Sequence, residues 1–189
     1  PRFAAKGGNA VANKVLRWLE LQQPRPGASF EDLAGFIDAN PDWPLQDVLM
    51  RRAEEALVER TDDSVVMAWF ALRGPATVDG AMRSAEALFR ANDRAKGVAT
   101  VREAWRSGGF GAKQEAAFVK RYRQYLTQSD HAERLDKLIW EGRYDEARRA
   151  TKLVDASTRA LADARIRLGT VSGGVEGAIK RVPESLQQD

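Results

Sequence analysis

The sequence predicts an all-α fold, an α-superhelix or solenoid of about ten or eleven helices that pair as antiparallel hairpins. Alanine, the strongest helix former, occurs 30 times in 189 residues and lies within segments that have helical apolar spacing. No run of alternating apolar and polar residues bounded by turns indicates a strand. Trp69, Trp105 and Trp140 recur at intervals of 36 and 35 residues, about the length of one helix pair.

Local start and stop signals delimit the predicted helices of the first half. Helix 9–23 carries an apolar stripe at i, i+4, i+7 and i+8 and ends at Pro24. Ser29, followed by acidic residues, caps helix 29–39. Asp42-Trp43-Pro44 is a start signal for helix 42–60, because aspartate caps and proline fits the first turn. The same signals predict helices 62–72 and 77–92.

The second half continues in the same way. Asp93 opens helix 93–107, which the turn Gly108–Gly111 ends. Further helices are expected at 112–126, 129–141, 143–154, 155–168 and 175–182. The connections are too short to span a helix, so consecutive helices must run antiparallel. Each of the three tryptophans is expected to be buried across its turn, against alanines of the returning helix: Ala81, Ala85 and Ala87; Ala112, Ala116 and Ala117; Ala147 and Ala150.

Composition excludes several classes of function. Without cysteine and with one histidine, the chain cannot form thiolate zinc sites, iron–sulfur ligation or a multi-histidine metal site, so no cofactor is expected. The net charge of +3 does not favour nucleic acid as a partner. No stretch approaches the roughly 20 apolar residues of a transmembrane helix. The chain begins at Pro1, which is not a translation start, so a targeting segment could have been removed.

The candidate catalytic residues all have a simpler structural explanation. His131 lies between Asp130 and Glu133, as a general base could, but acidic residues in a first helical turn are explained by the helix dipole. Three glutamates beside aromatic or small residues could have raised pKa values, although solvated helix faces are the better interpretation: Glu103, Glu115 and Glu141. The sequence therefore predicts no catalytic residue.

Basic residues recur on successive predicted helices, and stacking could align them along one edge that attracts an anionic polymer. They are Arg51, Arg52, Lys120, Arg121, Arg123, Arg148, Arg149, Lys152, Arg165 and Arg167. Most alternate with acidic residues, which is typical of solvated faces with i to i+4 ion pairs. The tryptophans are interpreted as core and turn residues and not as a sugar-stacking platform. Both interpretations of the basic residues stay open.

Four stretches carry a resemblance to a known family. They are Phe36–Pro44 with Leu49–Glu54; Trp69-Phe70 with Pro75, Thr77 and Gly80; Trp105 with Glu115, Phe118 and Tyr122; and Leu126-Thr127 with Asp130-His131, Arg134, Asp136, Leu138, Trp140, Gly142, Ala147 and Arg148, continuing to Arg159, Leu161, Ala162, Ala164, Arg165 and Leu168. Together with Val182–Leu186 they resemble the superhelical, non-catalytic region of the soluble lytic transglycosylases, the periplasmic enzymes that cleave the glycan strands of peptidoglycan.

The resemblance implies that residues 1–189 form one α-superhelical fragment, the U-type domain, of a larger periplasmic enzyme. The family's catalytic glutamate lies in a lysozyme-like domain after the superhelix, in a Glu-Ser motif with a Gly-Leu-Met-Gln stretch downstream. Glu184-Ser185 is interpreted as a chance dipeptide, because that stretch does not follow it here. By this resemblance the fragment would be a scaffold that positions glycan strands and the missing catalytic domain. The alternatives are a helical-repeat adaptor similar to tetratricopeptide proteins and, least favoured, a nucleic-acid-binding repeat.

Overall fold

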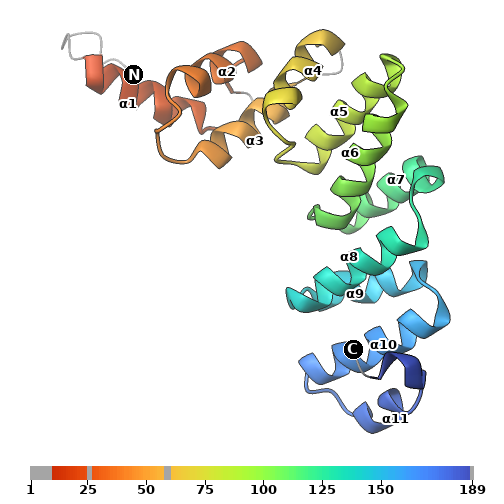
Figure 1. Cartoon of the computed structure of the whole chain (residues 1–189). Coiled ribbons are helices and arrows are strands. Elements are labelled where there is room, and N and C mark those ends of the chain that lie inside the picture. Colours follow the sequence, from red (N-terminus) through yellow and green to blue (C-terminus); the bar gives the residue numbers. More distant parts are fainter. Residues whose placement is uncertain (1–9, 25–26, 58–60, 188–189) are drawn as a thin grey trace. The chain divides into compact units, whose positions relative to one another are not determined.

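The computed structural model describes residues 10–24, 27–57 and 61–187, and this part of the chain is all-helical (Figure 1). The helices are α1 (Ala10–Leu21), α2 (Phe30–Ala39), α3 (Gln46–Ala56), α4 (Asp63–Leu72), α5 (Val78–Arg90), α6 (Arg94–Ser107), α7 (Ala112–Tyr122), α8 (Gln128–Trp140), α9 (Tyr144–Ala150), α10 (Ala156–Gly169) and α11 (Val175–Ile179), with 3-10 turns η2 (Arg123–Tyr125), η3 (Thr151–Leu153) and η4 (Glu184–Leu186). The all-α prediction and its number of helices are thus confirmed over the described residues. Within them no helix is long and apolar enough to cross a membrane.

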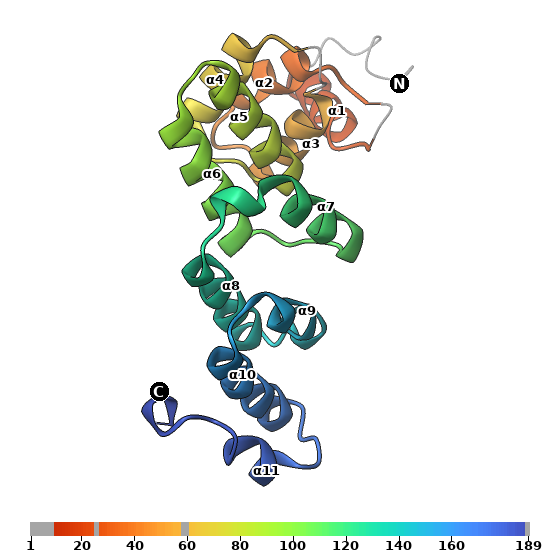
Figure 2. The same ribbon diagram turned by 90° about the vertical axis from the view of Figure 1, so that its right-hand side faces the viewer.

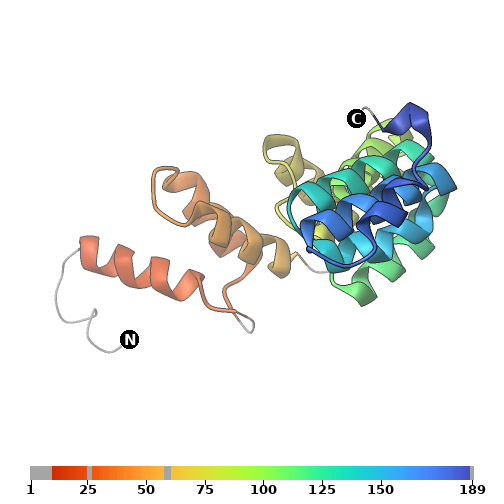
Figure 3. The same ribbon diagram turned by 90° about the horizontal axis from the view of Figure 1, so that it is seen from below.

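The chain divides into two compact units, Pro1–Gly97 and Val98–Asp189, with the boundary inside α6. In each unit, helices that follow one another along the chain pack in pairs: α2 with α3 and α4 with α5 in the first unit, α8 with α9 and α10 with α11 in the second. In Figure 3 the orange helices α2 and α3 lie side by side. This pairing of neighbours is the hairpin arrangement that the short connections predict.

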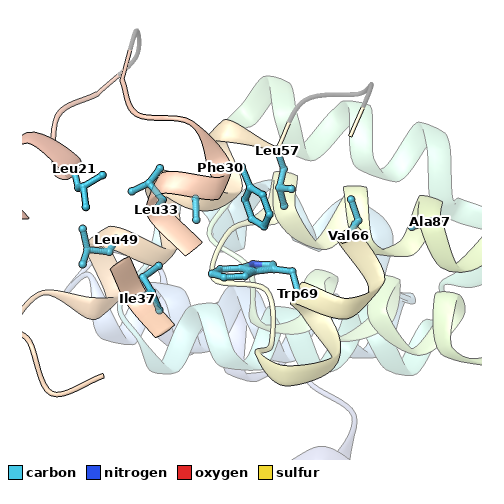
Figure 4. Packing of buried hydrophobic residues seen from close by; sticks show 10 residues of the cluster. Leu21, Phe30, Leu33, Ile37, Leu49, Leu57, Val66, Trp69 and Ala87 are labelled. Atoms are coloured by element: carbon cyan, nitrogen blue, oxygen red, sulfur yellow. The ribbon is translucent and has the colours of Figure 1, made fainter. Parts of the chain in front are cut away.

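The core of the first unit forms where the α2–α3 and α4–α5 pairs meet. Leu33, Ile37 and Leu49 contribute aliphatic side chains, and Trp69 lies against Phe30 edge to face at 5.2 Å between ring centroids (Figure 4). The guanidinium of Arg73 lies over the Trp69 ring, 4.3 Å from its centroid. The first tryptophan of the predicted series is therefore buried, 5% exposed.

A buried carboxylate joins α3 to the start of α5. Glu54 accepts hydrogen bonds from the backbone N–H groups of Ala76 (2.6 Å) and Thr77 (2.8 Å) and from the Thr77 hydroxyl (2.6 Å). A Cβ atom at Gly80 would overlap this carboxylate, which explains why glycine stands there. Burial raises the pKa of Glu54, although the hydrogen bonds from Ala76 and Thr77 oppose that shift.

In the second unit α10 packs against α8 and α9, and α11 packs against α10 (Figure 2). The core between them is aliphatic, with Leu135 and Leu138 of α8, Ala147 and Ala150 of α9, and Ile166 of α10. The two alanines of α9 are fully buried, as expected for small residues that let helix axes approach.

An aromatic cluster lies beside that core, where α7 returns against α6. Trp105 is 0% exposed, stacks on Phe118 at 5.8 Å and contacts Phe110 at 5.5 Å. The side chain of Arg134, 1% exposed, lies over both the Trp105 and Phe110 rings at 4.6 Å. It donates to the carbonyl oxygens of Trp105 and Gly108, each at 2.9 Å. Arg134 of α8 thus binds both the end of α6 and the turn that follows it.

Three sequence predictions are wrong. Trp140 is not buried across its turn but 85% exposed, because α8 places Leu138 and Ile139 toward the core instead. Ala112, Ala116 and Ala117 are exposed, and α7 buries Glu115, Phe118 and Tyr122. Asp42–Pro44 does not open a helix. The helix α3 begins later, after Leu45 in left-handed conformation (φ 60°).

Most of the remaining boundaries agree with prediction, but α3 ends at Ala56 and α11 at Ile179, both before the predicted ends at residues 60 and 182. Ser29, Thr77 and Asp155 cap their helices through side-chain oxygens, and Thr127 forms a capping box with Asp130 at the start of α8. The ends of the predicted helices 112–126 and 143–154 tighten into η2 and η3. The predicted residues 9, 58–60 and the ends of the chain lie outside the described residues.

One turn geometry recurs at the ends of α5, α8 and α10. In each, a left-handed residue follows the helix: Asn92 (φ 63°), Gly142 (φ 70°) or Val171 (φ 50°). Its N–H and the next N–H donate back to the last turn, as Gly142 does to Ile139 (3.1 Å) and Arg143 to Leu138 (2.8 Å). This is the Schellman arrangement, which satisfies the last carbonyl groups of a helix. Valine is the least suited of the three residues to this conformation.

Candidate functional site: an arginine-lined hollow along α10

The second unit carries an open hollow of about 640 Å³ along α10. Its lining comes from three consecutive elements and from two segments that follow them: Arg148 of α9, Thr151 of η3, then Ala156, Arg159, Ala160, Asp163, Ile166 and Arg167 of α10, Thr170 and Ser172 of the following turn, and Arg181 after α11. A volume of this size is typical of small-ligand sites.

The sequence of α10 explains the shape of the hollow. Its lining residues recur three and four positions apart, so they form one face of the helix. Two of them, Ala156 and Ala160, are small and leave space above the helix, and the buried Ile166 gives an apolar floor. From Ala156 to Thr170 this face extends about 21 Å at the helical rise of about 1.5 Å per residue. The hollow is thus elongated and suits an extended ligand.

Arginines lie toward both ends of this hollow. Near the start of α10, Arg159 donates to the carbonyl oxygens of Thr151 (2.8 Å) and Val154 (3.1 Å), and Arg148 pairs with the exposed Asp145 at 2.9 Å. Arg159 is thereby held at η3, and Arg148 is held by a carboxylate of its own helix.

Near the end of α10, Arg167 and Arg181 share one carboxylate. Arg167 donates from Nε to Asp163 at 3.1 Å and from Nη1 to the carbonyl of Gly173 at 2.8 Å. Arg181 donates to Oδ2 of the same Asp163 at 3.0 Å. One carboxylate thereby orients two guanidinium groups and neutralises only one of them.

The hollow therefore has an excess of positive charge. Four arginines line it, Asp163 is its one acidic lining residue, and Asp145 adds a second carboxylate through Arg148. Among the described residues no acidic side chain pairs with Arg159. The hydroxyl groups of Thr151, Thr170 and Ser172 add polar atoms that can donate or accept hydrogen bonds. The chemistry is that of an anion site with an apolar floor, and arginine is the residue best suited to bind carboxylates or phosphates.

The sequence predicted only part of this set. Of the ten basic residues singled out, Arg148 and Arg167 line the hollow. Others form ion pairs away from it, such as Arg51 with Asp47 (2.6 Å), Arg149 with Glu115 (3.0 Å) and Arg165 with Asp136 (2.5 Å). These ion pairs do not support a single continuous edge of basic residues. Sequence reasoning missed Arg159 and Arg181 as site residues. The spacing of Arg159, Asp163 and Arg167, four apart, was the available signal for the α10 face.

The predicted acid and base candidates lie away from the hollow lining. Glu115 is buried and pairs with the half-buried Arg149, and Arg134 comes within 4.0 Å of Glu115 and 3.8 Å of Glu146. Glu103 pairs with Arg106 at 3.2 Å, and Glu141 with Arg143 at 3.1 Å. All three carboxylates form ion pairs. Glu103 and Glu141 lie on exposed helix surfaces as predicted, but the prediction of a solvated face is wrong for Glu115, which is buried.

His131 also has a structural environment. Its ring meets the edge of Trp105 at 5.5 Å between centroids, and its Nδ1 atom is buried without a hydrogen-bond partner. Burial lowers the pKa of His131, although the charge of Asp130 opposes that shift. The imidazole is therefore a packing group beside the aromatic cluster.

Neither metal nor family identity is indicated. Among residues 10–24, 27–57 and 61–187, no group of three histidine or acidic side chains is placed to hold a metal ion. Comparison with protein families, with curated proteins and with solved structures gives no match to this chain.

Proposed function

We propose that the chain is a non-catalytic binding scaffold, the superhelical region of a periplasmic lytic transglycosylase, which holds peptidoglycan while a lysozyme-like domain elsewhere in the parent enzyme cleaves the glycan. The observation that carries the proposal is the open, positively charged hollow along α10, whose one acidic lining residue, Asp163, is paired with Arg167 and Arg181. Such a site can bind an anionic polymer, but it offers no carboxylate poised for acid–base chemistry.

Two further features support this division of roles. Neighbouring helices pair and each pair packs on the next, which is the arrangement of helical-repeat scaffolds. The four sequence stretches that resemble the lytic transglycosylases include residues that make specific stabilising contacts in this structure. Thr77 and Gly80 accommodate the Glu54 carboxylate, and Arg134 holds the Trp105 turn.

Co-sedimentation with purified peptidoglycan sacculi tests the proposal. The isolated chain is expected to pellet with sacculi, more weakly as salt rises because charges carry the binding. It should release no soluble anhydromuropeptides over many hours. Chitin, a neutral glycan without peptide carboxylates, is the matched control and should leave the chain in the supernatant. Failure to pellet with sacculi, or release of soluble products by the chain alone, would contradict the proposal.

A second candidate function is a protein-binding adaptor. The observation that favours it is Trp140, whose exposed indole at the end of α8 is the kind of residue that anchors protein interfaces. In the same sedimentation experiment an adaptor would stay in the supernatant with both polymers.

A further inference from the structure

The arrangement of the four arginines sets the spacing of the groups that the hollow could bind. Arg159 and Arg167 lie eight residues apart on one face of α10, which corresponds to about 12 Å along the helix. Arg181 is joined to Arg167 through Asp163, and Arg148 and Arg159 both bond to Thr151, the first through its carbonyl and the second through its side chain. Between Arg159 and Arg167 the lining has the small Ala160, the apolar Ile166 and the carboxylate of Asp163, which pairs with Arg167 and Arg181.

The hydrogen-bond partners show which charges remain for a ligand. Arg159 is held by backbone carbonyl groups alone, which orient the guanidinium but carry no full charge. At the other end Asp163 serves both Arg167 and Arg181. Each end of the hollow can thus accept one further anionic group, and an extended chain of about four amino-acid residues spans about 12 Å.

We propose that the hollow binds an extended acidic peptide of about four residues, with one carboxylate at Arg148 and Arg159 and another at Arg167 and Arg181. Small apolar side chains of the peptide lie over Ala160 and Ile166. This inference rests on the proposed function, since the short peptides carried by peptidoglycan glycan strands have carboxylates and small side chains of this kind. The hollow would bind the peptides attached to the glycan strand and not the sugars of the strand.

The fork of an arginine binds a planar carboxylate through two parallel hydrogen bonds, which gives such a site direction as well as charge. A phosphate could occupy one end of the hollow, but it would not reach the second pair of arginines or use the apolar floor. The length of the hollow therefore favours a ligand with two separated anionic groups.

The test measures binding of a purified disaccharide–tetrapeptide from peptidoglycan to the chain by isothermal titration calorimetry. Chemical amidation of the ligand's carboxylates is expected to weaken binding about tenfold or more, since a charged hydrogen bond contributes about 1.5 to 3 kcal/mol. Arg167→Gln and Arg181→Gln should each weaken binding of the unmodified ligand about tenfold or more for the same reason. Arg165→Gln is the matched control, because Arg165 lies on the same helix but pairs with Asp136 and does not line the hollow.

Asp163→Asn gives a test that a loss of folding cannot imitate. The substitution removes the carboxylate that competes for Arg167 and Arg181, so the ligand should bind several-fold more tightly. Unchanged or weaker binding in this variant, with thermal unfolding like that of the native chain, overturns the inference. Equal binding of the amidated ligand also overturns it, as does inorganic phosphate binding as tightly as the disaccharide–tetrapeptide.

The sedimentation experiment separates this inference from the proposed function. If Arg167→Gln and Arg181→Gln pellet with sacculi as strongly as the native chain, the hollow is not the site and the scaffold function stands. If the native chain does not pellet but binds the soluble ligand in the calorimeter, the scaffold function fails and the hollow still binds acidic peptides.

Discussion

Trp105 and Trp140 stand in equivalent places of the sequence repeat and in opposite environments, so they make a matched pair for mutation. Trp105 is 0% exposed, and a buried tryptophan removes about 150 to 250 Å² from water, which at about 25 cal/mol per Å² corresponds to about 4 to 6 kcal/mol. Alanine substitutions of buried aromatic residues cost about 3 to 5 kcal/mol. The Trp105 Nε1 atom has no hydrogen-bond partner, so packing accounts for the loss. We expect Trp105→Ala to lower the free energy of unfolding by about 4 kcal/mol.

Trp140→Ala should change the free energy of unfolding by less than about 0.5 kcal/mol, because its side chain is 85% exposed. Urea unfolding of both variants and the native chain, followed by far-UV circular dichroism, measures the difference. A loss of more than about 2 kcal/mol for Trp140→Ala would refute the assignment of its environment. A loss below about 1 kcal/mol for Trp105→Ala would refute the view that the aromatic cluster stabilises the second unit.

Four other predictions follow from the buried groups and turns. Gly80→Ala should destabilise the first unit by about 1 to 3 kcal/mol in urea unfolding, because its Cβ overlaps the Glu54 carboxylate, whereas Gly35→Ala, with open space, should not. Burial keeps the pKa of His131 in the folded protein below its ordinary 6.5, so the neutral ring contributes stability above pH 6.5 and this contribution is lost as the pH falls. NMR titration of His131 and the free energy of unfolding at pH 7.5 and pH 5 measure the effect, and His131→Leu should make the free energy of unfolding less dependent on pH. Arg134→Met should cost about 3 kcal/mol or more, since it removes two hydrogen bonds and leaves Glu115 and Glu146 with one partner fewer. Val171→Asn should raise the thermal midpoint, with a gain of about 0.5 to 1 kcal/mol from a residue that tolerates positive φ; a lower midpoint would contradict the strain at this turn.

Most of the fold could be predicted because its signals are local. Capping residues such as Thr77 and Asp155 act within their own helix, and the apolar spacing within one helix gives its buried face. The exposure of the Trp140 side chain could not be predicted in this way. Its burial depends on which neighbours α8 meets, and the buried Leu138 and Ile139 beside it satisfy the same helical spacing.

The start of α3 and the lining of the hollow could not be predicted from the sequence either, because both depend on contacts between separate segments. Asp42–Pro44 has the residue types of a cap, but Asn40 and Gln46 bond across this segment at 2.6 Å and the helix begins only after Leu45. Arg181 joins Arg167 at Asp163 although 14 residues separate the two arginines in sequence. That meeting depends on how α11 packs on α10, which no local pattern in the sequence contains.

The pairing of neighbours along the chain also bears on how the protein is made. In the second unit α8 finds its partner in α9, and α10 finds one in α11, over loops of a few residues. Contacts of such short sequence separation form rapidly and need no distant segment to arrive first. Each hairpin can therefore close as soon as its second helix has left the ribosome, and the core that it shares with the next pair is covered when those helices follow.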